Sequence, residues 1–227
     1  QFSEAAGVLK GLLKISPQDV EVLRELGGIY QKVGAYGLAE KAYNSAIDVA
    51  PGHADTPYDL GISLQNKGDW DPARQAFSSA LERDPDMVPA RVSLGNCFHQ
   101  TGEIDAAAKQ YQDALSQNPK LAHARLGACI SQLPIVYRSE EHLEQCRVGY
   151  ARALEDMFDY FASSSQEERS HAASAVGFLQ PFYLAYQGLP VKALQERYAA
   201  TIRMLMTSRF PQFDKRLPMP GIDGKIR

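Results

Sequence analysis

The apolar and small residues of this 227-residue chain recur with a period of 34 residues over its first half. Prolines mark the period at Pro17, Pro51, Pro85 and Pro119. Between two prolines, apolar positions follow the spacing of an amphipathic helix twice, and a glycine lies between the two runs. Each period therefore predicts a pair of helices, and the pairs are expected to stack in order as one repeat array.

The first helix of each pair carries a leucine and a glycine at offsets 9 and 10 from the proline. These are Leu26–Gly27, Leu60–Gly61 and Leu94–Gly95, followed at offset 13 by Tyr30, Leu64 and Phe98. A glycine inside a helix costs about 1 kcal/mol relative to alanine. Its recurrence at one offset indicates that another helix approaches closely there.

The second helix repeats alanine at offsets 22 and 29 and an aromatic residue at offset 26. The three sets are Ala39, Tyr43 and Ala46, then Ala73, Phe77 and Ala80, then Ala107, Tyr111 and Ala114. We expect the alanines to allow close helix contact and the aromatic residue to fill the space between pairs. At offset 17, Gly34, Gly68 and Gly102 are expected to end the first helices in a left-handed turn. The prolines are expected to begin helices, where their missing N–H costs nothing.

A 34-residue period of this kind is typical of the tetratricopeptide repeat (TPR). We therefore predict an all-α fold, a right-handed TPR superhelix of helical hairpins followed by a non-repeat α-helical segment. The expected boundaries are 1–17 for the second helix of an incomplete repeat, 18–133 for three full repeats and a partial fourth, 134–209 for a helical capping or linker segment, and 210–227 for a Pro/Gly-rich tail leading to a further domain. In the fourth repeat, Ala128 and Cys129 replace the Leu-Gly pair of a first helix over 122–132, so the pattern decays there.

Beyond residue 139 the sequence predicts helices without the 34-residue period. One long helix is expected over 139–162. Ser165 with Glu168 has the pattern of a capping box that opens a shorter helix ending at Gly177. A final helix is expected from Pro190, with a buried stripe of Val191, Leu194, Tyr198, Ile202 and Leu205.

The composition limits the classes of function. Lys and Arg number 24 against 27 Asp and Glu, for a net charge of −3, and no long run of like charges occurs, which argues against a nucleic-acid surface. No apolar stretch reaches the roughly 20 residues of a membrane helix, so we expect a soluble, cytoplasmic protein. Cys97, Cys129 and Cys146 are widely spaced, which favours free thiols over a disulfide framework or a zinc site.

The sequence shows no motif for catalysis or for cofactor binding. The five histidines form no His-x-x-x-His or His-Glu pair, and no serine lies in a Gly-x-Ser-x-Gly turn. A glycine-rich phosphate loop is also missing from the sequence. We therefore expect no catalytic residue, no metal site and no cofactor in this chain.

Three short motifs in the second half suggest a family. The first is Leu-Pro-Ile-Val-Tyr-Arg-Ser at 133–139, with Glu140, Glu141, Arg147 and Tyr150 after it. The second is residues 180–188 leading to 194–198, and the third is the terminal run 223–227. Together with the repeats, these motifs resemble the TPR-containing, nucleotide-sugar-dependent protein glycosyltransferases of the O-GlcNAc transferase and SPINDLY type, especially bacterial members.

This resemblance implies that a two-lobed glycosyltransferase domain would begin just beyond Arg227 and that this chain would be its acceptor-binding part. In better-known members an asparagine before the Leu-Gly pair holds the acceptor backbone. Here Glu25, Asp59 and Ser93 stand at that position, and a more acidic inner surface would favour basic or hydroxyl-rich peptides. The alternative is a free-standing scaffold that assembles other proteins, with the non-repeat helices as a cap.

The first helices of TPR pairs line the concave groove, so their exposed residues are the candidate peptide-binding positions. They are Glu21, Arg24, Glu25, Gln31, Asp55, Tyr58, Asp59, Gln65, Asn66, Asn96 and His99. The expected partners are protein or peptide segments, without nucleic acid or membrane. Weak self-association is also expected, through an open apolar face of the first helix that includes Ala5, Leu9 and Leu12.

Overall fold

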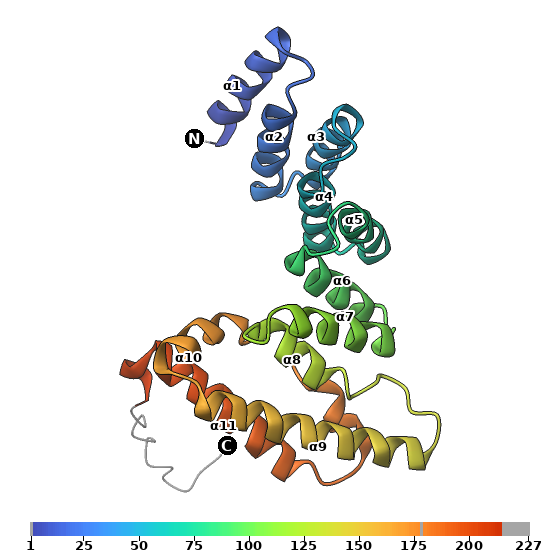
Figure 1. Cartoon of the computed structure of the whole chain (residues 1–227), viewed down its shortest axis with the longest axis vertical. Helices are drawn as coiled ribbons and strands as arrows, with labels where there is room; N and C mark the ends of the chain where they lie inside the picture. Colours follow the sequence, from blue (N-terminus) through green and yellow to red (C-terminus); the bar gives the residue numbers. More distant parts are fainter. Residues whose placement is uncertain (1, 178, 215–227) are drawn as a thin grey trace, which may run out of the picture.

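The computed structural model describes residues 2–177 and 179–214, and these ranges contain helices and no strand (Figure 1). The α-helices are α1 (Phe2–Ile15), α2 (Val20–Lys32), α3 (Tyr36–Val49), α4 (Asp55–Lys67), α5 (Trp70–Arg83), α6 (Val88–Gln100), α7 (Ile104–Gln117), α8 (Ala122–Ile130), α9 (Glu140–Ser163), α10 (Gln166–Ala172) and α11 (Lys192–Arg209). Short 3-10 helices cover Ala173–Ala175, Phe182–Gln187 and Pro211–Phe213. Helices α2 and α3, α4 and α5, and α6 and α7 pack as successive hairpins, which confirms the predicted fold class.

The prolines that mark the period lie in tight turns between hairpins. Before α2, the Asp19 N–H donates to the Ser16 carbonyl at 3.3 Å, with Pro17 in the second position of the turn. The same bond recurs from His53 to Ala50, from Met87 to Asp84 and from Leu121 to Asn118. Proline suits this position because its fixed φ matches the turn. The prolines thus precede the helices by three or four residues, and the prediction that they begin the helices is wrong.

The glycines at offset 10 lie where the two helices of a hairpin meet. Their partners are the aromatic residues at offset 26, in the pairs Gly27–Tyr43, Gly61–Phe77 and Gly95–Tyr111. A Cβ atom added to these glycines would stand 2.6, 2.5 and 2.8 Å from the respective ring, closer than real Cβ atoms approach other heavy atoms. Each glycine therefore lets the aromatic ring of the second helix lie directly on the backbone of the first, as the period predicts.

The turns inside the first three hairpins are built on left-handed glycines. Gly34, Gly68 and Gly102 have φ angles of 75°, 90° and 82°, a conformation that side chains rarely adopt. The second helix begins two residues after each glycine. The predicted left-handed ends of the first helices are thereby confirmed.

The fourth pair departs from this geometry. Helix α8 ends at Ile130 and α9 begins only at Glu140, so a loop over 131–139 replaces the tight turn. Val136 stands at the offset of the turn glycines, and a β-branched residue disfavours a left-handed turn. Helix α8 still packs on the third hairpin through Gly127, where an added Cβ would stand 2.6 Å from the Tyr111 ring. Gly127 thus meets the ring of the preceding hairpin, whereas Gly27, Gly61 and Gly95 each meet the ring of their own hairpin. The first helix is also shorter than the predicted 122–132.

Helices α8 to α11 build a second core. The inward side of α9 presents four large residues that are almost fully buried, Tyr150, Leu154, Met157 and Phe161. The predicted stripe of α11 packs against this cluster, with Leu205 at its centre. The capping box of α10 is confirmed, since the Ser165 hydroxyl accepts from the Glu168 N–H and the Glu168 carboxylate accepts from the Ser165 N–H. Gly177 follows with a φ of 90°.

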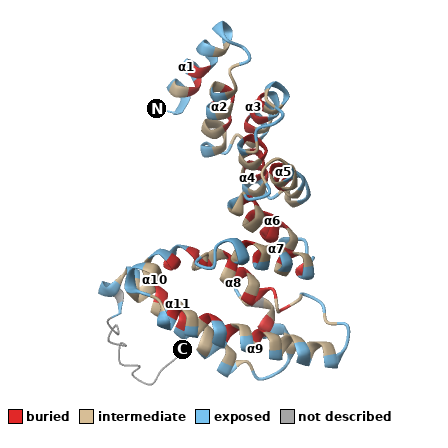
Figure 2. Cartoon of the chain, in the orientation of Figure 1, coloured by how far each residue is buried: buried red, intermediate tan, exposed pale blue. Residues whose placement is uncertain are grey.

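Buried residues run along the inside of the hairpin column and through the middle of α8, α9 and α11 (Figure 2). Among the helices that the structure describes, none is both long and apolar enough to cross a membrane. The terminal motif at 223–227 and the tail from 215 onward lie outside the described residues.

Candidate functional site

The first helices α2 and α4 follow one side of the column, with α3 and α5 on the other (Figure 1). Between α2 and α4 lies an open pocket of about 340 Å³. Its walls come from Glu21, Arg24, Glu25, Gly28, Gln31, Lys32, Tyr43, Asp59 and Ile62. The pocket brings together five of the predicted groove residues, and we call it the α2–α4 groove.

An ion pair joins the two helices across this groove. Arg24 donates from Nη2 and Nε to Asp59 Oδ2 at 2.9 and 3.2 Å, and its Nη1 lies 3.4 Å from both carboxylate oxygens of Glu21. Burial raises the pKa of the Asp59 carboxyl, although the Arg24 hydrogen bond opposes the shift. Burial acts to lower the pKa of Arg24, but the hydrogen bond and charge of Asp59 outweigh it, so that pKa is raised. The guanidinium is therefore a fixed positive charge surrounded by carboxylates.

At the base of the groove, the aromatic residue of a second helix can form a hydrogen bond to a glutamine of the first helix. The Tyr43 hydroxyl donates to Gln31 Oε1 at 3.3 Å, and burial raises the pKa of Tyr43 to about 12. In the next repeat, Gln65 occupies the position of Gln31, but Phe77 has no hydroxyl. Gln65 Oε1 is consequently buried without a hydrogen-bond partner among the described residues. The hydrogen bond that Tyr43 makes to Gln31 is thus missing between Phe77 and Gln65, because Phe77 lacks the hydroxyl oxygen.

Phe77→Tyr is expected to restore this hydrogen bond and to raise the free energy of unfolding by about 0.5 to 1.5 kcal/mol. The new hydroxyl would lie against Gln65 as the Tyr43 hydroxyl lies against Gln31. Urea denaturation of the two proteins measures the difference. The gain should disappear when Gln65→Ala is added. If Phe77→Tyr raised the stability equally in the Gln65→Ala background, the gain would not come from the hydrogen bond to Gln65.

The predicted groove residues of α2 and α4 differ in how far they are buried. Glu21, Glu25, Asp55 and Asn66 are exposed, whereas Arg24, Gln31, Tyr58, Asp59 and Gln65 are half-buried. Tyr58 packs on the buried Phe77 ring, with the ring centroids 5.8 Å apart. The sequence argument missed Gly28, Lys32, Tyr43 and Ile62. A signal existed for two of them, because Gly28 and Ile62 share offset 11 in successive repeats.

Two predicted groove residues are not exposed. Asn96 and His99 are only 5% and 7% exposed, because α6 contacts both α4 and α8. Asn96 accepts a 2.6 Å hydrogen bond from the buried Tyr111 hydroxyl, which is a packing role. Both His99 ring nitrogens are buried without a partner among the described residues. The expectation that these two side chains line an open groove is therefore wrong.

Acidification is expected to destabilise the fold through His99. Burial lowers its pKa, and likewise that of His123, so the folded chain binds these protons less readily than the unfolded chain. Unfolded histidine titrates near pH 6.5. Above about pH 6.5 the neutral rings cost the folded chain no stability. As the pH falls through that value toward the lower pKa of the folded state, the free energy of unfolding decreases, because the unfolded chain takes up these protons first. Protonation would leave an unpaired charge in the interior.

His99→Gln should therefore flatten the dependence of unfolding free energy on pH between about pH 7 and 5. Urea denaturation at closely spaced pH values measures this slope. His53→Gln changes an exposed ring and should leave the slope as it is. Parallel curves for the wild-type chain and His99→Gln would refute the assignment.

The described residues define a helical-repeat protein whose hairpins are arranged as in tetratricopeptide-repeat solenoids, with an open pocket between two of its first helices. The family described as tetratricopeptide repeat matches residues 58–122. A crystal structure of MamA is similar with a TM-score of 0.58 and 23% identity, over 68% of this chain and 87% of that one. MamA 41-end from Desulfovibrio magneticus RS-1 gives a TM-score of 0.57 and 18% identity, over 68% and 84%. At these identities the likeness shows the fold alone.

A third similar structure is the Arabidopsis OM64 TPR domain, with a TM-score of 0.46 and 21% identity over 48% of this chain and 89% of that domain. No curated protein sequence matches this chain significantly. Within the described residues, no group of three or more His, Cys, Asp or Glu side chains could hold a metal ion. What the groove offers chemically is hydrogen bonding and charge pairing, which suits recognition of another polypeptide.

Proposed function

We propose that the chain is a protein-binding module whose α2–α4 groove holds a segment of another protein. The observation that carries this proposal is the open pocket between the two helices, with polar side chains at repeated positions on its rim. Glu21 and Glu25 of the lining are exposed, and Asp55 and Asn66 are exposed on α4. Helical-repeat proteins use extended inner surfaces of this kind to bind other chains.

The charges of the groove favour a basic segment. Three carboxylates line the groove, Glu21, Glu25 and Asp59, against the two cations Arg24 and Lys32. Asp55 lies outside this lining but is close enough to help raise the pKa of Arg24, so negative charge prevails around the groove. Arg24 is already engaged by Asp59 and Glu21. Glu25 and Asp55 form no ion pair within the part of the chain that the structure describes. A lysine or arginine of a bound segment would therefore pair with these two carboxylates, and serine or threonine hydroxyls would donate to them.

Binding of peptide pools by fluorescence anisotropy tests this function. A pool of decapeptides rich in Lys and Arg should bind more tightly than a matched acidic pool, and the preference should weaken with added salt. The double variant Glu25→Gln, Asp55→Asn should weaken binding of the basic pool about tenfold. Glu144→Gln, on the exposed face of α9, serves as the control. Equal binding of both pools removes the charge preference, and failure of every pool to bind argues against the groove as a binding site.

The finer proposal is that this module recognises acceptors for a nucleotide-sugar-dependent protein O-glycosyltransferase. Its support is the motif resemblance at 133–139 and 180–198. If the gene continues in frame beyond Arg227 with alternating strands and helices, groove variants of the whole enzyme should lose transfer to protein acceptors. Hydrolysis of the sugar donor should be unaffected. Equal transfer by wild-type and groove-variant enzymes would disprove acceptor recognition here.

A free-standing scaffold in the cytoplasm is the second candidate. The packing of α9 and α11 against α8 favours it, because these helices cover one end of the hairpin column as the caps of repeat arrays do. A stop codon directly after Arg227 would support this reading. All three cysteines are free thiols, which agrees with a reducing compartment.

Self-association through α1 is expected as a minor property of the described chain. Leu9 is only 8% exposed and packs in one cluster with Leu26 of α2, so the expectation that it belongs to the open face is wrong. Val8 and Leu12 are 64% and 44% exposed, whereas Ala42 and Ala46, 34 residues later, are 7% and 0% exposed. The first helix of a hairpin covers these positions in α3 but not in α1. Light scattering should detect concentration-dependent dimers that Val8→Ser with Leu12→Ser abolishes. Leu38→Ser, on an exposed part of α3, should leave the dimers intact, and dimers that survive the α1 substitutions would exclude this interface.

A further inference from the structure

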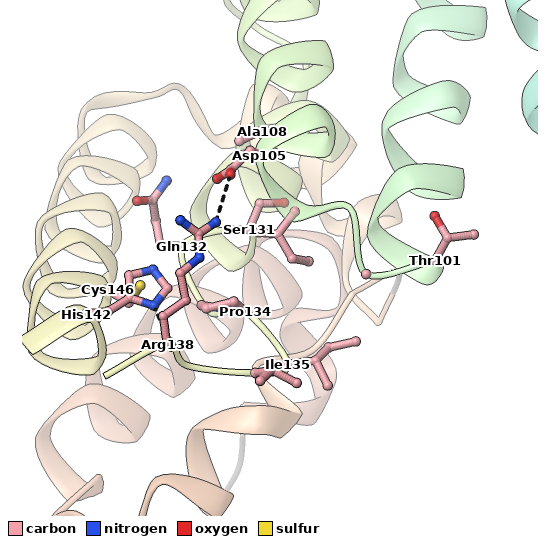
Figure 3. A pocket seen from close by; sticks show the side chains of 13 residues that line it. Thr101, Asp105, Ala108, Ser131, Gln132, Pro134, Ile135, Arg138, His142 and Cys146 are labelled. Carbon is pink, nitrogen blue, oxygen red and sulfur yellow. Dashed lines mark hydrogen bonds and ion pairs between the residues drawn. The ribbon is translucent and has the colours of Figure 1, made fainter. Parts of the chain in front are cut away.

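The loop that replaces the fourth hairpin turn creates a second pocket, away from the α2–α4 groove. This pocket of about 460 Å³ is bounded by the turn before α7, the start of α7, the loop itself and the first turns of α9 (Figure 3). The first three hairpins close their turns on left-handed glycines within two residues. The fourth pair of helices, α8 and α9, is open instead, because the loop 131–139 separates the two helices. We call this space the α7–α9 pocket.

A buried hydroxyl in the wall of this pocket lacks a partner. Ser131 lines the pocket and is only 4% exposed. Its Oγ makes no hydrogen bond within the described residues. An unsatisfied buried hydroxyl costs free energy that a ligand acceptor would recover. Ser131 thus favours a ligand with an oxygen acceptor.

Two further donors stand at the same pocket. Arg138 Nη2 lies 3.9 Å from Asp105 Oδ2, and the two side chains are 81% and 100% exposed, so this contact holds neither group firmly. Figure 3 shows the Arg138 side chain running from the loop toward Asp105. The Arg138 backbone N–H donates to His142 Nδ1 at 3.2 Å. The neutral imidazole therefore carries its proton on Nε2, which is a donor.

The carboxylate in the pocket is the better satisfied of the two charges. Asp105 lies in the first turn of α7, where the free N–H groups and the helix dipole stabilise a negative charge. Glu140 and Glu141 occupy the same favourable position in α9 and do not line the pocket. Arg138 lies in the loop and has no such support. A ligand carboxylate would therefore pair with the positive charge of Arg138.

The loop adds an apolar surface beside these donors. Pro134, Ile135 and Val136 line the pocket, and both Ile135 and Val136 are exposed. Exposed aliphatic side chains next to a charged rim are typical of protein docking sites. A ligand that combines an anionic group with an aliphatic side chain would use both surfaces.

We propose that the α7–α9 pocket is a second docking site, for a partner segment in which an aspartate or glutamate stands beside an aliphatic residue. Its carboxylate accepts from Arg138, from His142 Nε2 and from Ser131 Oγ. Its aliphatic side chain lies on Ile135 and Val136. The preference is opposite in charge to that of the α2–α4 groove, so the two sites select different segments.

Decapeptide pools with a fixed Leu-Leu-X core and random flanks test this site, with X as Glu, Gln or Lys. The Glu pool should bind about tenfold more tightly than the Gln pool, because one charged hydrogen-bond partner is removed. Arg138→Gln should abolish the difference between the pools. Arg203→Gln, at an exposed position of α11, should preserve it. Melting temperatures of both variants check that the fold is intact.

Cys146 provides an independent readout of the same pocket. It lines the pocket and is partly exposed, whereas Cys97 and Cys129 are buried. A saturating Glu pool should slow alkylation of Cys146 by iodoacetamide, followed by mass spectrometry, with the two buried thiols as internal references. Three results would overturn the proposal: equal binding of the Glu and Gln pools, an unchanged preference for Glu over Gln in Arg138→Gln, or unprotected Cys146 at saturation.

Discussion

Phe77→Ala is expected to lower the free energy of unfolding by about 3 to 5 kcal/mol. The Phe77 ring is fully buried, lies on the backbone of Gly61 and packs against Tyr58. Its removal leaves a cavity between α4 and α5 in the middle of the column. Because each hairpin is supported only by its neighbours, the loss should also weaken the contact with α6.

Urea denaturation followed by circular dichroism measures this effect. Leu38→Ala removes an exposed side chain from α3 and should change stability by less than about 0.5 kcal/mol. A melting temperature that Phe77→Ala leaves unchanged would contradict the packing described above. Loss of cooperativity in place of a uniform shift would indicate that the hairpins on the two sides unfold separately.

Gly61→Ala is expected to destabilise the chain by about 1 to 3 kcal/mol, even though alanine is the better helix former by about 1 kcal/mol. The added Cβ would stand 2.5 Å from the Phe77 ring, so the ring or the helix must move. Gly11→Ala in α1 is the matched control, because no described atom lies within 4 Å of its added Cβ. There the helix propensity acts alone, and stability should rise by about 0.5 to 1 kcal/mol.

The two glycine substitutions are expected to change the free energy of unfolding in opposite directions, and this difference is the informative result. Both glycines lie inside helices, α1 and α4, and both changes add one methyl group. If Gly61→Ala stabilised the chain as Gly11→Ala does, the glycine at offset 10 would not serve close packing. Thermal unfolding of the two variants beside the wild-type chain decides between these outcomes.

The sequence was sufficient to predict the hairpins, because their contacts depend on residue size at fixed offsets. Gly61 and Phe77 are recognisable as partners from spacing alone, since the same sizes recur in the neighbouring repeats. The fourth repeat departs from this pattern. There Gly127 lies on the ring of the preceding hairpin, Tyr111, a contact that the period does not predict. Sequence alone does not distinguish the two positions of the prolines, since a β-turn and a helix start both favour proline.

The groove could be predicted in part. Helical position identifies the side of the helix on which Arg24 and Asp59 lie, but not that they pair across two repeats. It also cannot show that neighbouring helices cover Asn96 and His99. The α7–α9 pocket was beyond sequence reasoning, because its shape depends on the path of a nine-residue loop, 131–139. Its one sequence signal is Val136, which stands where the other repeats have glycine.

Small and aromatic residues recur every 34 positions because successive helices pack directly on each other's backbones. A double-mutant cycle between Gly61→Ala and Phe77→Leu tests it most directly. If the ring lies on the glycine, a smaller side chain should relieve the clash. Gly61→Ala should then cost less in the Phe77→Leu background, by at least about 1 kcal/mol. Strictly additive effects of the two substitutions would contradict the claim.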